Sequence, residues 1–383
     1  MYSIQEAGTK LKYLKNIDYL LSFITLTLSG IGILTLHSAT RVMPEKVNGD
    51  SIFLKQVIAL ILGILLCIIL NTVIDYDILK KLSKMLYLAS IALLVLVLFL
   101  GTGKSQVGTN GWFYFMGVGF QPAEFSKLSF VLVLSIFLEK IKDNENTKRN
   151  IIKLIIYSII PIILVLVQPD TGTALVFIFT FFIMVFICGI PYKYIFLSIF
   201  SFVASLPFIW YLILKPYQKD RILAFISPNN MKYLNNISYQ SYQGQMAIGS
   251  GQIFGNGLYD GLQTQSLSIP EKHTDFIFSV IGEELGFIGC LIVVVLFYIL
   301  LIRCVYIARN TRDRYGSFVI IGLTSMFAFH ITENIGMNVG ILPITGIPLP
   351  FMSYGGSSLL ASFAAVGIIL NISSRNFKKG MFS

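Results

Sequence analysis

Long apolar runs recur along the whole chain and are separated by short polar stretches. A helix that crosses a bilayer needs about 20 mainly apolar residues. Ten runs approach that length, and they cover residues 17–38, 52–74, 82–101, 122–140, 151–168, 170–189, 193–214, 276–303, 315–340 and 356–373. The pattern predicts an all-α polytopic membrane protein with about ten transmembrane helices, folded as a single domain over residues 1–383.

One polar stretch is much longer than the others. It extends from about residue 215 to 275, between the seventh and eighth predicted helices, and contains the glycine-rich segment GQMAIGSGQIFGNG. We expect part of it to form a short amphipathic helix along the membrane surface, followed by tight turns. Long ordered loops are more often functional than idle, so this loop is a candidate site.

The distribution of basic residues predicts the orientation. The chain is 55% hydrophobic and 13% charged, with a formal net charge of +10. Cytoplasmic loops carry an excess of Lys and Arg. With both termini in the cytoplasm, nineteen Lys and Arg lie inside and nine outside, while Lys127 falls within a helix. The long loop is then extracellular, and the basic excess indicates contact with anionic membrane lipid rather than nucleic acid.

Asp275 stands where the long loop meets the eighth predicted helix. An ionisable residue at such a boundary is a candidate functional group. It is either a general base at the outer membrane surface or an acid stabilised by the helix dipole, and position alone does not separate the two. His273 is the rival base or an orienting partner.

Two further predicted helices open with Gln-Pro and a carboxylate in the first turn, Glu124 in one and Asp170 in the other. Proline suits the first helical position, and the acid complements the helix dipole. Lys127 lies one turn after Glu124, on the same face. This pair is either structural or places Lys127 near a phosphate, and Asp170 is open to the same two interpretations.

Other polar groups lie near the same membrane surface. Lys219 and Arg221 follow the seventh predicted helix, where they either extend toward the interface or bind a diphosphate. The Pro- and Gly-rich stretch 334–358 is expected to line a pocket, because non-helical backbone at membrane depth must be buried or face a cavity. Its Ser353 and Ser357 could bind sugar or phosphate groups, or cap a helix. His330, Glu333 and Asn334 share a helix face, where polar contacts between helices fit better than a metal site.

Together these segments resemble the SEDS family (shape, elongation, division and sporulation). The resemblance covers nearly the whole chain, through QPAEFSKL, QPDTGTA, KPYQKDRI, YQSYQGQMAIGSGQIFGNG, PEKHTDFIFSVIGEELGFIG and LPITGIPLPFMSYGGSS. The ENIGM and TGIPLPF motifs are more similar to the RodA branch than to the FtsW branch. Many relatives have Arg before the Trp of the third outer loop, but here Gly111 precedes Trp112, which puts a phosphate contact at that position in doubt.

The resemblance implies a glycosyltransferase that polymerises lipid II into undecaprenyl-linked glycan at the outer face of a bacterial plasma membrane, in support of cell elongation and shape. It implies Asp275 as the essential aspartate, with Glu124, Lys127 and Asp170 as further site residues. It also implies a class B penicillin-binding protein, a transpeptidase, as partner. A divalent cation such as Mg²⁺ or Mn²⁺ could assist the diphosphate, although no ligand cluster demands a bound metal.

The rival function is a flippase that transports the lipid-linked precursor. Transporters place substrate groups near the bilayer midplane. The ionisable residues of this chain instead gather at the predicted outer ends of the helices, and this favours chemistry at the surface.

Overall fold

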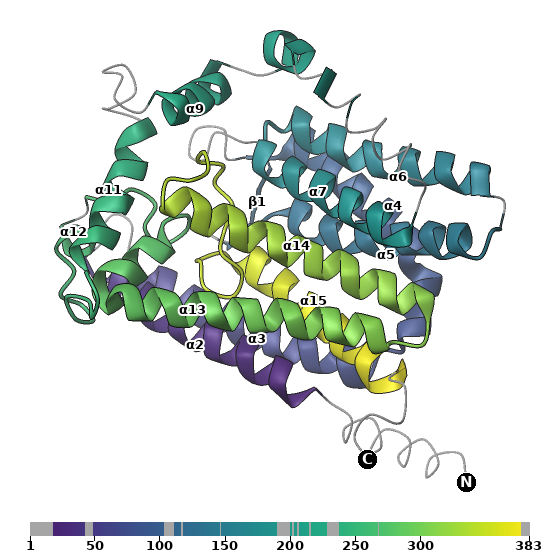
Figure 1. Cartoon of the computed structure of the whole chain (residues 1–383), viewed down its shortest axis with the longest axis horizontal. Coiled ribbons are helices and arrows are strands. Elements are labelled where there is room, and N and C mark those ends of the chain that lie inside the picture. Colours follow the sequence, from purple (N-terminus) through teal and green to yellow (C-terminus); the bar gives the residue numbers. More distant parts are fainter. Residues whose placement is uncertain are drawn as a thin grey trace.

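The computed structural model describes residues 18–42, 49–102, 111–115, 118–145, 147–189, 200, 203–204, 207–213, 216–227, 237–266 and 268–376. Within these ranges, nine long helices lie side by side as a bundle (Figure 1). They are α2 (Tyr19–Thr40), α3 (Gly49–Thr72), α4 (Tyr76–Leu100), α5 (Pro122–Lys142), α6 (Thr147–Val167), α7 (Thr171–Cys188), α13 (Ile277–Asn310), α14 (Arg314–Asn338) and α15 (Gly356–Asn376).

The long polar stretch forms short elements beyond one end of the bundle, at the left and top left of Figure 1. They are α9 (Pro216–Ile226), α11 (Ile237–Ser250) and α12 (Leu262–Gln265). Turns over residues 251–260 follow α11, which is the expected order of a helix and then turns, while the amphipathic position along the membrane surface stays a prediction. A π-helical turn, η1 (Ile209–Ile213), precedes α9, and a small antiparallel hairpin, β1 (Phe113–Phe115) and β2 (Val118–Phe120), precedes α5.

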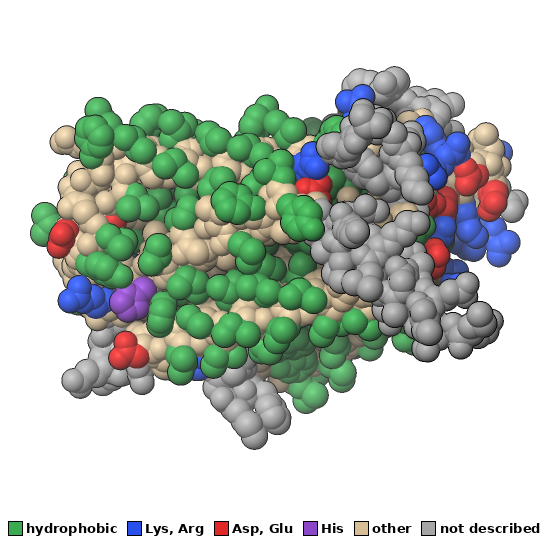
Figure 2. Space-filling model, turned by 90° about the horizontal axis from the view of Figure 1, so that it is seen from below, with side chains coloured by type: hydrophobic (Ala, Val, Ile, Leu, Met, Phe, Trp, Pro, Cys, Tyr) green, Lys and Arg blue, Asp and Glu red, His purple; other side chains and the backbone are tan. Residues whose placement is uncertain are grey.

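Eight of the described helices are long and apolar enough to cross a membrane, namely α2, α3, α4, α6, α7, α13, α14 and α15. Figure 2 shows hydrophobic side chains over the middle of the molecule, with charged side chains toward its ends. Exposed apolar surface of this extent suits lipid rather than water. The prediction of an all-α polytopic membrane protein is confirmed.

Two predicted spans differ from these eight. Helix α5 coincides with the fourth predicted run, but it carries five charged side chains, at positions 124, 127, 139, 140 and 142. The seventh run, 193–214, lies mostly outside the described residues. The expected total of about ten therefore stays a prediction.

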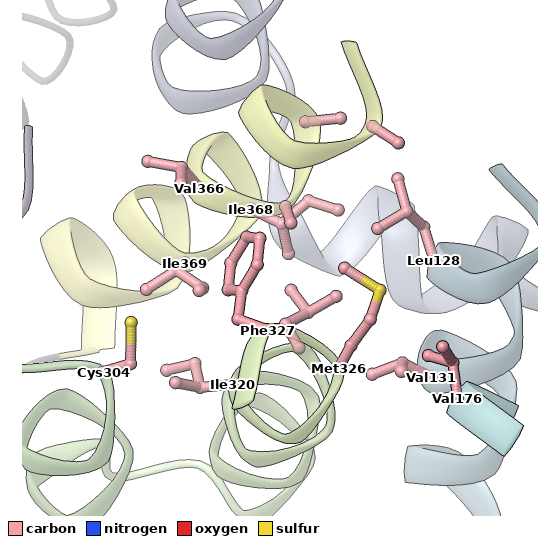
Figure 3. Close-up of a cluster of buried hydrophobic side chains, with 14 of the residues drawn as sticks. Leu128, Val131, Val176, Cys304, Ile320, Met326, Phe327, Val366, Ile368 and Ile369 are labelled. Atoms are coloured by element: carbon pink, nitrogen blue, oxygen red, sulfur yellow. The ribbon is translucent and has the colours of Figure 1, made fainter. Parts of the chain in front are cut away.

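Helices α14 and α15 form the centre of the bundle, because most of their residues are buried inside it. Figure 3 shows Met326 and Phe327 of α14 packed between side chains of α5 and α15. A β-carbon on Gly322 would lie 2.5 Å from the Val131 side chain of α5. A residue without a side chain allows this close approach between membrane helices, so α14 lies directly against α5.

Helix α13 is interrupted at Gly286, whose φ of 68° and ψ of −166° are not helical. The neighbouring turn satisfies the backbone groups at the break: Phe287 N donates to Gln252 O (2.8 Å) and Asn256 N to Glu283 O (3.0 Å). Backbone polar groups at membrane depth need such partners. The apolar run 276–303 gave no indication of this interruption.

The two ends of the bundle have different neighbours. At one end, Arg303 Nε donates to Asp18 Oδ2 over 2.8 Å. At the other, His37 Nδ1 lies 3.0 Å from the Tyr259 hydroxyl in the long polar stretch. The start of α2 and the end of α15 therefore lie opposite α11 and α12 (Figure 1).

Candidate active site

Asp275 lies in the turn that precedes α13, and the helix begins at Ile277. Its amide donates to Glu271 O over 3.1 Å. Its carbonyl oxygen accepts from two side-chain amides of α14, Asn334 Nδ2 at 3.0 Å and Asn338 Nδ2 at 2.9 Å. The turn is thus held in place through backbone hydrogen bonds. These bonds do not involve the Asp275 carboxylate.

The expected similarity to the other two acidic helix starts is only partial. Asp170 is the N-cap of α7, where its Oδ1 accepts from Thr173 N over 3.0 Å. Among the described residues, the N-cap of α13 is Phe276, without a side-chain hydrogen bond. Asp275 therefore does not cap its helix, and the dipole-acid interpretation of this residue loses its main support.

The Asp275 carboxylate faces the segment that joins α14 to α15. Gly346 in this segment has a φ of +77°, and a β-carbon there would lie 3.4 Å from Asp275 Oδ2. From the other side, Arg221 of α9 donates to Ile344 O of the same segment over 3.5 Å. The same segment is therefore contacted by an acid from the turn before α13 and by a cation from α9.

Burial raises the pKa of Asp275 to about 7, and the nearby Glu271 adds to this rise. The Arg221 charge and a hydrogen bond from Thr274 oppose it. A general base works best when its pKa lies near the operating pH. The raised pKa of Asp275 is compatible with its predicted role as a general base, which stays a prediction.

His273 contacts Tyr354, just before α15, through its backbone and its ring. Its backbone carbonyl accepts from Tyr354 N over 2.8 Å, and its ring centroid lies 5.7 Å from that of Tyr354. Burial lowers the pKa of His273, although Glu271 opposes this, its Oε2 lying 4.0 Å from the imidazole Nε2. These contacts join the turn that carries Asp275 to Tyr354. They are compatible with a role for His273 as an orienting partner.

Glu124 and Lys127 form a buried ion pair. Lys127 Nζ lies 2.8 Å from Glu124 Oε1 and 2.9 Å from His330 Nε2 of α14. Residues 124 and 127 are 4% and 2% exposed. The structure therefore gives both side chains protein partners inside the bundle, as the structural interpretation expects.

Asp170 and the two serines join helix starts. Asp170 Oδ2 accepts from Gln121 Nε2 over 3.2 Å, and the Gln121 backbone amide donates to Ser357 Oγ over 3.0 Å. Ser353 Oγ donates to Thr274 O over 2.5 Å and accepts from Leu349 N over 2.8 Å. Both serines are buried. The Ser353 hydroxyl fastens the Asp275 turn through Thr274 O, and the Ser357 hydroxyl fastens the start of α5 through Gln121 N.

The two basic residues of α9 differ in position. Lys219 Nζ lies over the Trp210 ring at 6.0 Å, whereas Arg221 faces the segment beside Asp275. Both are half-buried. Of the two, Arg221 is the cation that the structure brings to the acid.

Several supporting residues escaped the sequence analysis. Gln56 of α3 donates to Ser353 O (2.9 Å) and accepts from Gly355 N (3.1 Å). Lys272, 2% exposed, donates to Thr264 O, and burial lowers its pKa to about 8 against the opposing charges of two glutamates. Asn338 was also missed. The one available signal for it was its spacing of four residues from Asn334, which places both on one face of α14.

No three His, Cys, Asp or Glu side chains gather to hold a metal ion in the described part of the chain. The suggestion that a divalent cation such as Mg²⁺ or Mn²⁺ assists the diphosphate stays a prediction.

The fold and the site define a polytopic membrane protein with a half-buried acid at one end of its helix bundle. The family model of cell cycle proteins named for FtsW, RodA and SpoVE matches residues 19–378. The chain belongs to this family, and the resemblance to SEDS proteins is confirmed.

Individual relatives support the same family membership. The chain is 36% identical over 362 residues to the probable peptidoglycan glycosyltransferase FtsW of Trichlorobacter lovleyi, covering 93% of each protein. It is similar to a chain of a peptidoglycan synthase complex that coordinates polymerization and crosslinking, with TM-score 0.77, 31% identity, and coverage of 93% of this chain and 97% of that one. RodA of Thermus thermophilus matches with TM-score 0.69, 28% identity and coverage of 94% and 98%.

Proposed function

We propose that this chain is a peptidoglycan glycosyltransferase that polymerises lipid II at the outer face of a bacterial plasma membrane. The observation that carries the proposal is the Asp275 carboxylate, which has a pKa of about 7 and faces Gly346 at one end of the bundle. Similarity to proteins named peptidoglycan glycosyltransferase supports the reaction class.

In the proposed reaction, the sugar 4-hydroxyl of one lipid II attacks C1 of the growing undecaprenyl-linked glycan. A new C1–O bond forms while the bond from C1 to the diphosphate oxygen breaks. The electron pair leaves with undecaprenyl diphosphate, and Asp275 accepts the hydroxyl proton. One displacement converts the α linkage of the donor into a β-1,4 linkage.

The leaving diphosphate needs positive charge. Arg221 is the best placed of the predicted cations, because it lies beside the segment that faces Asp275, and its guanidinium can bind phosphate through two donors. Lys219 on the same helix is the second candidate. Lys127 is buried and bonded to Glu124 and His330, so it is better suited to supporting the site than to contacting phosphate.

The positions of these elements support the proposed orientation. The site lies at the bundle end opposite the start of α2 and the end of α15 (Figure 1). With both termini in the cytoplasm, Asp275 and the loop of residues 215–275 face outward, where the glycan grows. We place the chain as a single domain, 1–383, in the plasma membrane.

Similarity to a solved structure also suggests the proposed partner. One similar chain comes from a peptidoglycan synthase complex that coordinates polymerization and crosslinking. A class B penicillin-binding protein would supply the crosslinking transpeptidase. Both FtsW and RodA are among the similar proteins. The sequences of the ENIGM and TGIPLPF segments favour the RodA branch and a role in cell elongation and shape.

The test is lipid II polymerisation by the purified protein, with and without its transpeptidase, beside the Asp275→Asn variant. A positioned base contributes about 10²–10⁴-fold, so the variant should lose that factor while its thermal stability is no lower than that of wild type. Asp260→Asn is the matched control, since Asp260 is an exposed carboxylate in the same loop. Full activity in Asp275→Asn would refute the assignment of the base. Polymerisation by neither protein would favour the flippase, which a vesicle assay with lipid II would detect.

A further inference from the structure

Three polar side chains lie one turn apart on α14, and all are buried. His330 is 4% exposed, and Asn334 and Asn338 are 0% exposed. A spacing of four residues places them on one helix face. Burying polar groups is costly unless they are hydrogen-bonded, so their partners indicate what this face does.

The two asparagines fasten both sides of the Asp275 site. Asn334 Nδ2 donates to Asp275 O (3.0 Å) and to Ile347 O (2.8 Å). Asn338 donates to Asp275 O (2.9 Å), and its Oδ1 accepts from Ser279 Oγ (2.7 Å). The turn that carries Asp275 and the segment that carries Gly346 are therefore fixed to the same helix face.

His330 extends this row in the opposite direction, toward α5. Its Nδ1 lies 3.2 Å from Pro348 O, next to the carbonyl that Asn334 binds, and its Nε2 lies 2.9 Å from Lys127 Nζ. An ammonium group donates and cannot accept, so Nε2 accepts the Lys127 hydrogen. Nδ1 then carries the ring hydrogen and donates it to Pro348 O. The orientation of the ring is thus fixed from both sides.

We propose that His330 is a positioning residue that couples the Glu124–Lys127 pair on α5 to Asp275, by fastening the 344–348 segment through Pro348. The proposal rests on the proposed function, in which Asp275 is the base. His330 acts through the segment, because its own contacts are with Lys127 and Pro348. The coupling gives Lys127 a role without phosphate contact.

The physical consequence of losing His330 can be stated. Without it, Pro348 O and one Lys127 donor lose their partner. Thr345 keeps its bond to Glu333 (2.7 Å) and Ile347 keeps its bond to Asn334, so Gly346 becomes more mobile against the Asp275 carboxylate without being released. Water then reaches the carboxylate, so its pKa falls toward the ordinary range. Of the charged groups around it, Glu271 lies outside the 344–348 segment, whereas Arg221 is bonded to Ile344 O within it.

The test compares His330→Leu with His330→Gln, since a glutamine amide can accept from Lys127 and donate to Pro348 O. A misplacement of about 1 Å costs on the order of 10²-fold in rate, so His330→Leu should lower kcat about 10–100-fold with KM unchanged. The acid limb of its pH–rate profile should move to lower pH. His330→Gln should restore most of both properties, while Ser325→Ala, a buried residue bonded to Gly322 O of its own helix, should behave as wild type.

Hydrogen exchange over residues 342–349 provides a measurement that needs no turnover. Exchange should be faster in His330→Leu and in Lys127→Met, and the double variant should add little to either, because both changes break one chain of contacts. Exchange in His330→Leu equal to wild type, or equal impairment of the Leu and Gln variants, would overturn the coupling. If Asp275→Asn polymerised lipid II normally, the base assignment would fail, and the exchange result would still decide the role of His330.

Discussion

Gly346 lies against the Asp275 carboxylate in a backbone conformation that side chains rarely adopt: its φ is +77°, and a β-carbon would lie 3.4 Å from Oδ2. The backbone conformation favours glycine, whereas a β-carbon at that distance would make an ordinary van der Waals contact. The left-handed region costs other residues roughly 1–2 kcal/mol. The acid and the glycine come from segments 71 positions apart in the chain, and the asparagines of α14 bring them together.

Gly346→Ala should therefore impair the site more than it impairs the fold. We expect a loss of about 1–2 kcal/mol in stability and a loss of about 10-fold or more in polymerisation, because relief of the strained left-handed backbone displaces the segment that faces Asp275. Gly30→Ala is the control, since Gly30 has open space around it in the lipid-exposed part of α2. Activity equal in the two variants would show that the contact with Gly346 does not matter for the reaction.

Lys127→Met should destabilise the protein strongly, because it leaves Glu124 buried without its cation. Breaking a buried pair from one side typically costs about 3–5 kcal/mol, whereas replacing both partners by apolar groups can be nearly neutral. The double variant Glu124→Leu/Lys127→Met should therefore recover much of the thermal stability in detergent. A double variant whose loss equals the sum of the two single losses would contradict this account.

Gly286→Ala should prevent accumulation of the folded protein. Gly286 combines a φ of +68° with tight backbone contacts, since a β-carbon would lie 2.6 Å from Ile253 O and clash with Gly255 N. No nearby side chain can move to relieve this. Quantifying monodisperse protein after purification, with Gly30→Ala as the matched substitution, checks the prediction. Normal yield would mean that the break in α13 is not required.

Much of this architecture could be predicted because hydrophobic runs report burial in lipid directly. The runs located the described spans, and the Gln-Pro starts located the acids of α5 and α7. The role of Gly286 could not be predicted, because a glycine inside an apolar run carries no local signal of a break. Nor could the contacts of Gln56 and Asn338 with segments far away in sequence, since these depend on how the helices pack.

The two charged neighbours of Asp275 should move the acid limb of activity in opposite directions. Asp275 must be ionised to accept a proton, and its pKa is about 7, so activity should rise with pH through about 7. Glu271 raises this pKa and Arg221 lowers it. Glu271→Gln should therefore shift the limb to lower pH, and Arg221→Gln should shift it to higher pH with an additional loss of rate from the diphosphate contact.

The same shift has a consequence for stability with a definite sign. Because the pKa of Asp275 is higher in the folded protein than its ordinary value of 3.8, folding favours the protonated acid. Its contribution to stability is complete below that ordinary value and is lost as the pH rises through about 7. Asp275→Asn cannot ionise, so it should lose less stability than wild type between pH 5 and pH 8, a range of about three pH units around neutrality. Thermal unfolding in detergent across this range measures the difference, and parallel curves for the two proteins would show that the pKa of Asp275 is not raised.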